Sequence, residues 1–198
     1  MKKASLLFCA IVFLPAILAG RALAGSASDA STLPQASSSG ESRALSEVRA
    51  GILIHDRGLF IPRRETGQDL NVEVLFRSPR WKLFQAVWSP RPHVGISIND
   101  EGQTSQFYGG FTWEWRPFGN AFIDGSLGLS VHDGHLRTSR PDREGLGSRV
   151  LFRESIELGY RFHARHALSF IVDHISNAGL TPENDGITST GFRYGYRF

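Results

Sequence analysis

The chain has a single cysteine, Cys9, which lies within an N-terminal apolar run from Leu6 to Leu18. Two lysines precede this run and a small-x-small stretch ending at Ala24 follows it, as in a cleaved secretory signal peptide. The run is shorter than the about 20 residues that a membrane-spanning helix needs. We therefore expect residues 1–24 to be removed. Cys9 leaves with them, which excludes disulfides and thiolate chemistry in the mature protein.

The mature chain also lacks an excess of charge of one sign. The formal net charge of the full sequence is +3, and residues 1–24 contain three basic residues and no acid. Removing them leaves the mature chain near neutral. The high isoelectric point therefore gives no support for a nucleic-acid partner.

Beyond the signal there is no apolar run of about 18 residues, which excludes a membrane protein built from helices. Residues 25–45 are rich in Ser and Ala without apolar periodicity, and we expect a flexible leader. From residue 46 to residue 198, apolar and polar residues alternate in eight segments of the length, about ten residues, that crosses an outer membrane. The segments are 46–55, 68–77, 91–99, 107–115, 120–131, 149–162, 168–176 and 192–198.

Such alternation also fits a soluble sandwich or a lipocalin-like barrel with its apolar face turned inward. The membrane alternative is favoured by aromatic residues at the ends of the apolar faces, such as Trp113, Tyr160 and Tyr194. The opposite faces carry Arg and Glu, which suit a narrow polar lumen. The sequence therefore predicts an all-β fold, an eight-stranded antiparallel transmembrane β-barrel over residues 46–198, with a lumen filled by side chains.

Loop lengths orient this barrel in the membrane. The links 116–120 and 163–166 are short, and the links 132–147 and 178–186 are long. Outer-membrane barrels have short periplasmic turns and long extracellular loops. The connection 78–90 is long for a periplasmic turn, and the pattern does not explain it.

The stretch "FIVDHISNAGLTPENDGITS" places two polar residues on the apolar, outward face of the seventh segment. His174 and Ser176 follow Leu168, Phe170 and Val172 on this face. Successive residues on one face of a strand are about 6.6 Å apart, so an imidazole and a hydroxyl can meet there. This is the arrangement of a nucleophile beside its base. The spacing alone also fits two polar residues at the level of the lipid headgroups.

The motif "HISNAGLTPENDGI", after "LFRESIELGYRF" and before a last strand ending "YRF", resembles the lipid A 3-O-deacylases over roughly residues 150–198. The resemblance implies an enzyme of the Gram-negative outer membrane that hydrolyses the acyl ester at the 3-position of lipid A. It implies that His174 and Ser176 form a serine-hydrolase site on the outside of the barrel. It also implies an oxyanion hole made by Asn177 with the N–H groups of Ala178 and Gly179.

The chain departs from the family at the acid that orients the histidine. The family has a Glu two residues after the Asp-Gly of the loop, where this sequence has Thr188. Glu154 is the one charged residue on the outward face of the sixth segment, and a carboxylate facing lipid is costly unless it is paired. One register about the "HARH" turn places Glu154 opposite His174, and the other even register places Ile156 there.

The sequence thus predicts an outer-membrane esterase with lipopolysaccharide as its substrate. An inactive barrel of the same family stays open because of Thr188, and so does an outer-membrane phospholipase. The seven histidines are scattered without a completing ligand set, so we expect no metal and no cofactor. The oligomeric state is open, a homodimer included.

Overall fold

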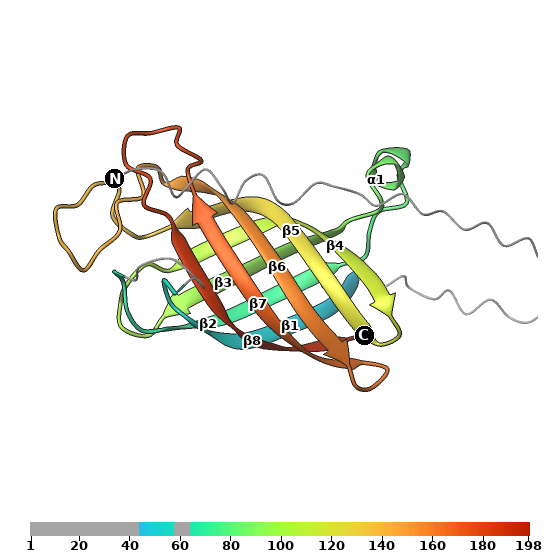
Figure 1. Ribbon diagram of the computed structural model, residues 1–198. Coiled ribbons are helices and arrows are strands. Elements are labelled where there is room, and N and C mark those ends of the chain that lie inside the picture. The colour runs from blue at the N-terminus through green and yellow to red at the C-terminus, as the bar shows by residue number, and fades with distance from the viewer. Residues whose placement is uncertain (1–43, 58–63) are drawn as a thin grey trace, which may run out of the picture.

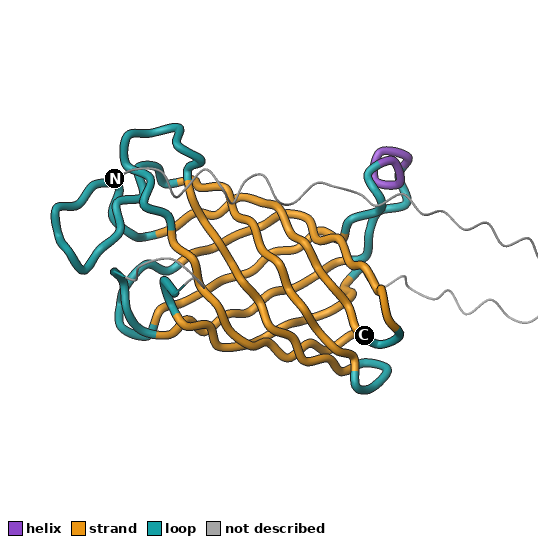
Figure 2. The backbone as a smooth tube through the Cα atoms, viewed as in Figure 1, coloured by secondary structure: helices purple, strands orange, loops and turns teal. Residues whose placement is uncertain are grey.

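The computed structural model describes residues 44–57 and 64–198, which form one closed antiparallel barrel of eight strands (Figure 1; Figure 2). Each strand pairs with the next along the chain, and β1 closes the barrel against β8. The predicted signal peptide and nearly all of the predicted leader lie outside the described residues.

The eight alternating segments of the sequence are the eight strands, which confirms the predicted fold. They are β1 (Leu45–Ile54), β2 (Gln68–Phe76), β3 (Arg91–Asn99), β4 (Gln106–Phe118), β5 (Ala121–His132), β6 (Val150–Arg161), β7 (His166–Ser176) and β8 (Ile187–Arg197), with one short helix, α1 (Lys82–Ala86). The last strand starts at Ile187 rather than at residue 192. The prediction missed its first residues because "ITST" has threonines at the outward positions, Thr188 and Thr190, where the other segments have apolar residues.

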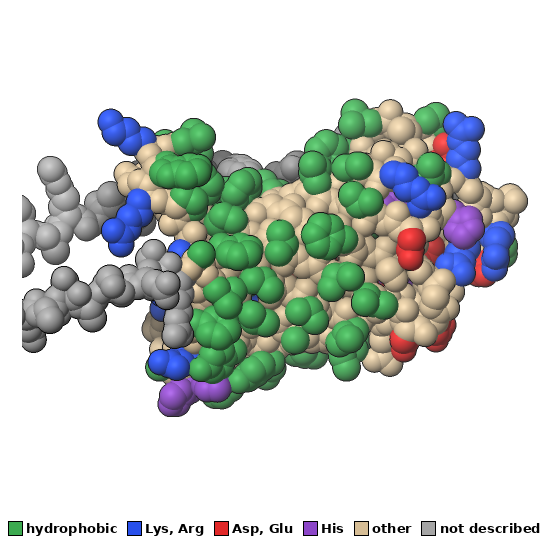
Figure 3. All heavy atoms as spheres, turned by 180° about the vertical axis from the view of Figure 1, so that it is seen from behind, with side chains coloured by type: hydrophobic (Ala, Val, Ile, Leu, Met, Phe, Trp, Pro, Cys, Tyr) green, Lys and Arg blue, Asp and Glu red, His purple; other side chains and the backbone are tan. Residues whose placement is uncertain are grey.

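The apolar residues of the strands point outward. Ile52, Leu70, Phe107 and Phe192 are exposed, whereas Glu73 is buried inside the barrel. Figure 3 shows hydrophobic side chains spread over the barrel wall and charged ones gathered toward its ends. A soluble barrel would have the opposite arrangement, so the soluble alternative is wrong and the wall is built to face lipid.

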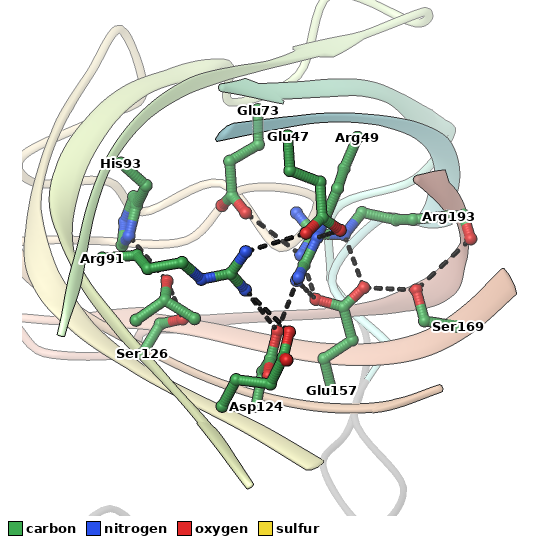
Figure 4. Close-up of polar contacts among 12 residues, drawn as sticks. Glu47, Arg49, Glu73, Arg91, His93, Asp124, Ser126, Glu157, Ser169 and Arg193 are labelled. Atoms are coloured by element: carbon green, nitrogen blue, oxygen red, sulfur yellow. Dashed lines mark hydrogen bonds and ion pairs between the residues drawn. The ribbon is translucent and has the colours of Figure 1, made fainter. Parts of the chain in front are cut away.

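The lumen is filled by hydrogen-bonded charges. Arg49 donates to Glu47 at 2.9 Å, to Asp124 at 2.6 Å and to Glu157 at 2.5 Å (Figure 4). Glu157 also accepts a hydrogen bond from Arg193. Buried charges persist where they are paired in this way, and the network ties strands from opposite sides of the barrel together.

The two ends of the barrel differ. The connections β4–β5 and β6–β7 are tight turns at one end, where the C-terminus and α1 also lie (Figure 1). The connections β5–β6 and β7–β8 are long loops at the other end, which is the extracellular one in barrels of this kind. None of the described helices is long and apolar enough to cross a membrane.

Candidate active site

The candidate site lies at the long-loop end of β7, where three strands present polar residues on the outward face. His174 pairs with Glu154 of β6 on one side and with Thr188 of β8 on the other. The register that places Glu154 opposite His174 is therefore confirmed. The alternative with Ile156 is wrong, because Ile156 pairs with Val172.

Thr188 orients the imidazole. His174 Nδ1 lies 2.8 Å from Thr188 Oγ1, and the Thr188 side chain is buried. When Nδ1–H donates to this hydroxyl oxygen, Nε2 keeps its lone pair for a proton. The position where the family has a carboxylate is thus still a hydrogen-bond partner of the histidine, although an uncharged one.

Glu154 supplies the negative charge that Thr188 lacks. It is half-buried on the outer wall between the exposed Phe152 and Ile156, and its carboxylate interacts electrostatically with the imidazole of His174. His174 therefore has a hydrogen-bond partner on one neighbouring strand and a negative charge on the other.

The β7–β8 loop folds back over the pair, so Ser176 is less open than its place on the outward face suggests. Ser176 is only 7% exposed. Gly186, with φ of 70°, is packed so closely that a Cβ there would lie 3.1 Å from His174 Cε1 and 3.4 Å from Ser176 Cβ. A glycine is required at this position both for the left-handed backbone and for the close approach.

A tight turn follows Ser176. Ala178 and Gly179 have φ of 55° and 80°, and Leu180 N donates to Asn177 O at 3.1 Å, as in a type I′ turn. Ala178 is one of four described non-glycine residues with positive φ. Such strained conformations cluster at functional sites.

The three residues expected in the oxyanion hole have different surroundings. Asn177 is buried, and its Nδ2 lies 2.9 Å from Leu146 O and 2.5 Å from Glu183 O. Its Oδ1 accepts a hydrogen bond from Gly179 N at 2.9 Å. Asn177 thus holds the loops together and does not point at the nucleophile. Of these three residues, Ala178 has an N–H with no acceptor among the residues that the structure describes.

The extracellular loops are tied together beside the site, a feature that sequence reasoning missed. Asp185 accepts a hydrogen bond from Gly145 N at 3.0 Å, and its own N donates to Gly145 O at 3.2 Å. Arg64 reaches Asp185 at 3.0 Å and Glu144 at 3.4 Å. The loop that carries Asn177 is therefore fixed by residues from two other loops, which are too far away in the sequence to give a local signal.

Two titratable groups in this region have shifted pKa values. Burial, together with the neighbouring carboxylates of Asp56 and Asp185, raises the pKa of Glu144 to about 8. Burial alone would lower the pKa of His55, but hydrogen bonds to Asp69 and Glu65 outweigh it and raise that pKa to about 9. The described residues include no group of three or more His, Cys, Asp or Glu arranged to hold a metal ion.

A closed barrel with apolar residues outward and ion pairs inward defines an outer-membrane β-barrel. The family model for lipid A 3-O-deacylase (PagL) matches residues 70–197, well beyond the residues 150–198 that carry the motif, and the chain belongs to this family. It is thus an outer-membrane hydrolase of the lipid A deacylase family. Neither the family match nor the structure of the single chain gives support to a homodimer.

The chain is similar to solved structures of outer-membrane proteins. The crystal structure of the outer membrane enzyme PagL is 20% identical with a TM-score of 0.57, over 77% of this chain and 99% of that chain. The Yersinia pestis outer membrane protein Ail is 11% identical with a TM-score of 0.44, over 78% of this chain and 99% of that chain. No curated protein sequence matches the chain significantly.

Proposed function

We propose that the protein hydrolyses the 3-O-linked acyl ester of lipid A by a serine-hydrolase mechanism on the outer wall of the barrel, with Ser176 as nucleophile and His174 as base. Membership of the family supports the substrate. The observation that carries the mechanism is the environment of His174. The imidazole lies between Thr188 and Glu154 and shares its face of β7 with Ser176.

In the first half of the reaction, His174 Nε2 takes the proton of Ser176 as Oγ bonds to the ester carbonyl carbon. The tetrahedral intermediate carries its charge on the former carbonyl oxygen. The N–H of Ala178, which has no acceptor among the described residues, is the candidate donor to this oxyanion. One well-aimed donor of this kind typically contributes about 3 kcal/mol of transition-state stabilisation.

In the second half, the carbon–oxygen bond to the sugar breaks, and His174 gives its proton to the departing 3-hydroxyl oxygen. The acyl chain stays on Ser176 Oγ. Water then attacks the acyl-enzyme while His174 takes a proton from it, and the fatty acid and the serine hydroxyl are restored. Thr188 holds the tautomer through both halves, and Glu154 stabilises the imidazolium that forms in each.

The position of the site supports a lipid substrate. Lipopolysaccharide occupies the outer leaflet, and the site lies on the lipid-facing wall at the extracellular end of β7. An ester can therefore reach Ser176 from the side, without the lipid leaving the membrane. The 7% exposure of Ser176 then requires the β7–β8 loop to shift when the acyl chain binds.

Mass spectrometry of lipid A from cells with and without the gene tests the proposal. We expect the loss of one 3-hydroxyacyl chain where the protein is present. Unchanged lipid A would indicate an inactive barrel, an alternative that is supported by the presence of Thr188 at the position of the family's Glu. Free fatty acid with lysophospholipid, and intact lipid A, would indicate a phospholipase.

A further inference from the structure

The long connection between β2 and β3, residues 77–90, forms an exposed apolar surface at the short-turn end of the barrel. It contains α1, which stands off to the side of the barrel (Figure 1) and has no buried residue. Trp81, Leu83 and Trp88 are 69%, 72% and 67% exposed. Large apolar side chains that are clustered and exposed on a membrane protein are expected to lie in a nonaqueous environment.

All four tryptophans of the chain are in this corner of the molecule. Trp81 and Trp88 belong to the connection, while Trp113 and Trp115 lie on β4, the strand beside it. Trp113 Nε1 donates to Val87 O at 2.8 Å, and Phe84 packs edge-on against Phe111 of β4 at 5.7 Å between ring centroids. The connection is thus fastened to the lipid-facing wall. Tryptophan is enriched where a bilayer meets water.

The same connection carries only positive charge. Arg77, Arg80 and Lys82 are exposed, and residues 77–90 contain no acidic residue. None of the three has a carboxylate partner among the residues that the structure describes. Exposed basic side chains next to apolar ones favour binding to an anionic lipid surface.

A cavity of about 340 Å³ lies between the connection and the mouth of the barrel. Its lining includes Arg77, Trp88, Ser89 and Glu114. Trp88 and Ser89 have φ of 60° and 52°, so two successive residues other than glycine hold a left-handed backbone at its rim. Strain of this kind is retained where surrounding structure imposes it, often at ligand sites.

We propose that residues 77–90 bind an anionic phospholipid of the periplasmic leaflet. The phosphate lies against Arg77 at the cavity, with Arg80 and Lys82 contributing charge, and the acyl chains run along Trp81, Leu83 and Trp88. Two observations favour a lipid over a protein partner. The apolar surface is continuous with the lipid-facing wall through Trp113 and Phe111, and the short-turn end of an outer-membrane barrel is periplasmic.

This surface is remote from the candidate active site. It adjoins β3 and β4, whereas His174 and Ser176 are on β7, three strands beyond β4 in a closed barrel of eight and at the opposite end. Substitutions in residues 77–90 therefore leave deacylation intact, and a failure of either proposal is distinguishable from a failure of the other.

Tryptophan quenching tests the proposal directly. In a Trp115→Phe background, the three remaining tryptophans belong to the connection or contact it. The protein is reconstituted into phosphatidylcholine vesicles that contain small amounts of either brominated phosphatidylglycerol or brominated phosphatidylcholine. We expect brominated phosphatidylglycerol to reach half-maximal quenching at a mole fraction at least about five-fold lower than brominated phosphatidylcholine does. This factor corresponds to the binding free energy that one basic residue contributes near an anionic surface.

Charge variants supply the control. Arg77→Gln, Arg80→Gln and Lys82→Gln together should abolish the preference for phosphatidylglycerol. Arg137→Gln, Arg140→Gln and Arg143→Gln, which remove three cations from the β5–β6 loop, should keep it. Heat-modifiable migration on gels establishes that each variant is folded.

Equal quenching by the two lipids in the parent would overturn the proposal. The proposal would also be overturned if aqueous iodide quenched these tryptophans and the brominated lipids did not, because the surface would then be exposed to water.

Discussion

At the scale of single residues, the proposed mechanism divides the work of one acid between two side chains. Thr188 holds the Nδ1 side of the imidazole at 2.8 Å, and Glu154 provides negative charge from the neighbouring strand. A hydroxyl can fix the tautomer, but it cannot stabilise an imidazolium as a carboxylate can. In the proposed mechanism, the activity of this chain therefore depends on Glu154 of β6 as well as on His174 and Ser176 of β7.

The first prediction concerns this division. Glu154→Gln should lower the turnover of lipid A by a factor of about 10². Removal of a whole orienting carboxylate from a triad lowers turnover by a factor of about 10⁴. The loss should be smaller here because Thr188 still holds the tautomer of His174. Thr188→Glu should add little, because the charge is already supplied. Deacylation rates of the purified variants measure both effects. A neutral Glu154→Gln together with a gain of activity in Thr188→Glu would contradict the role of Glu154.

Gly186 offers a second test at this scale. Gly186→Ala should lower turnover by more than about ten-fold, because the added methyl group pushes on His174 Cε1 at 3.1 Å and the φ of 70° is unfavourable for alanine. Gly102 is a matched control, since its φ is 67° and nothing lies within 4 Å of a Cβ there. Similar activity losses in Gly102→Ala and Gly186→Ala would show that backbone strain, and not contact with the site, is responsible.

At the scale of elements, strands could be predicted from the sequence and loops could not. Alternation along β6 and β7 sets which residues face outward, and the short turn between them sets the register that brings Glu154 opposite His174. The place of Asn177 could not be predicted in this way. Its amide bonds to Leu146, thirty-one positions away, and to Glu183, within a loop that has no periodicity.

The ties between the extracellular loops predict a pH dependence. The pKa of Glu144 is raised from 4.5 to about 8 on folding, and that of His55 from 6.5 to about 9. Stability from either group is present below its unfolded pKa and is lost as the pH rises through its folded pKa. The loops should therefore loosen as the pH rises from about 4.5 to about 9, with the contribution of Glu144 lost by about pH 8 and that of His55 lost by about pH 9.

Trypsin cleavage after Arg137 in the β5–β6 loop, normalised to an unstructured peptide at each pH, measures this loosening. The cleavage rate should rise with pH, and the part of the rise due to Glu144 should end near pH 8 and the part due to His55 near pH 9. Glu144→Gln should remove the rise below about pH 6.5, to which His55 does not contribute, and keep the rise from about pH 6.5 to about pH 9. An unchanged pH profile in Glu144→Gln would show that Glu144 does not control the loops.

At the scale of the whole molecule, the barrel is inverted relative to a soluble protein, with apolar residues outside and ion pairs inside. Glu157 of β6 interacts with both Arg49 and Arg193, which are buried and come from the adjacent strands β1 and β8 (Figure 4). The interior is therefore a charge-balanced core and not a channel. Removal of one charge affects several strands at once.

Glu157→Gln should lower the free energy of unfolding by about 3–5 kcal/mol, because two buried guanidinium groups lose a shared partner. Glu183→Gln is the matched control, since its partner Arg137 is 80% exposed and such surface pairs contribute about 0–1 kcal/mol. Urea unfolding in lipid vesicles measures both. Equal losses in the two variants would contradict a structural role for the lumen network.

The central claim, hydrolysis through Ser176, is tested most directly with purified protein and purified lipid A. The release of 3-hydroxy fatty acid is measured for the parent, for Ser176→Ala and for Ser139→Ala, which changes an exposed loop serine. We predict full activity in Ser139→Ala and a loss of at least about 10³ in Ser176→Ala, with the barrel still heat-modifiable on gels. Activity of folded Ser176→Ala within a few-fold of the parent would contradict the acyl-enzyme mechanism.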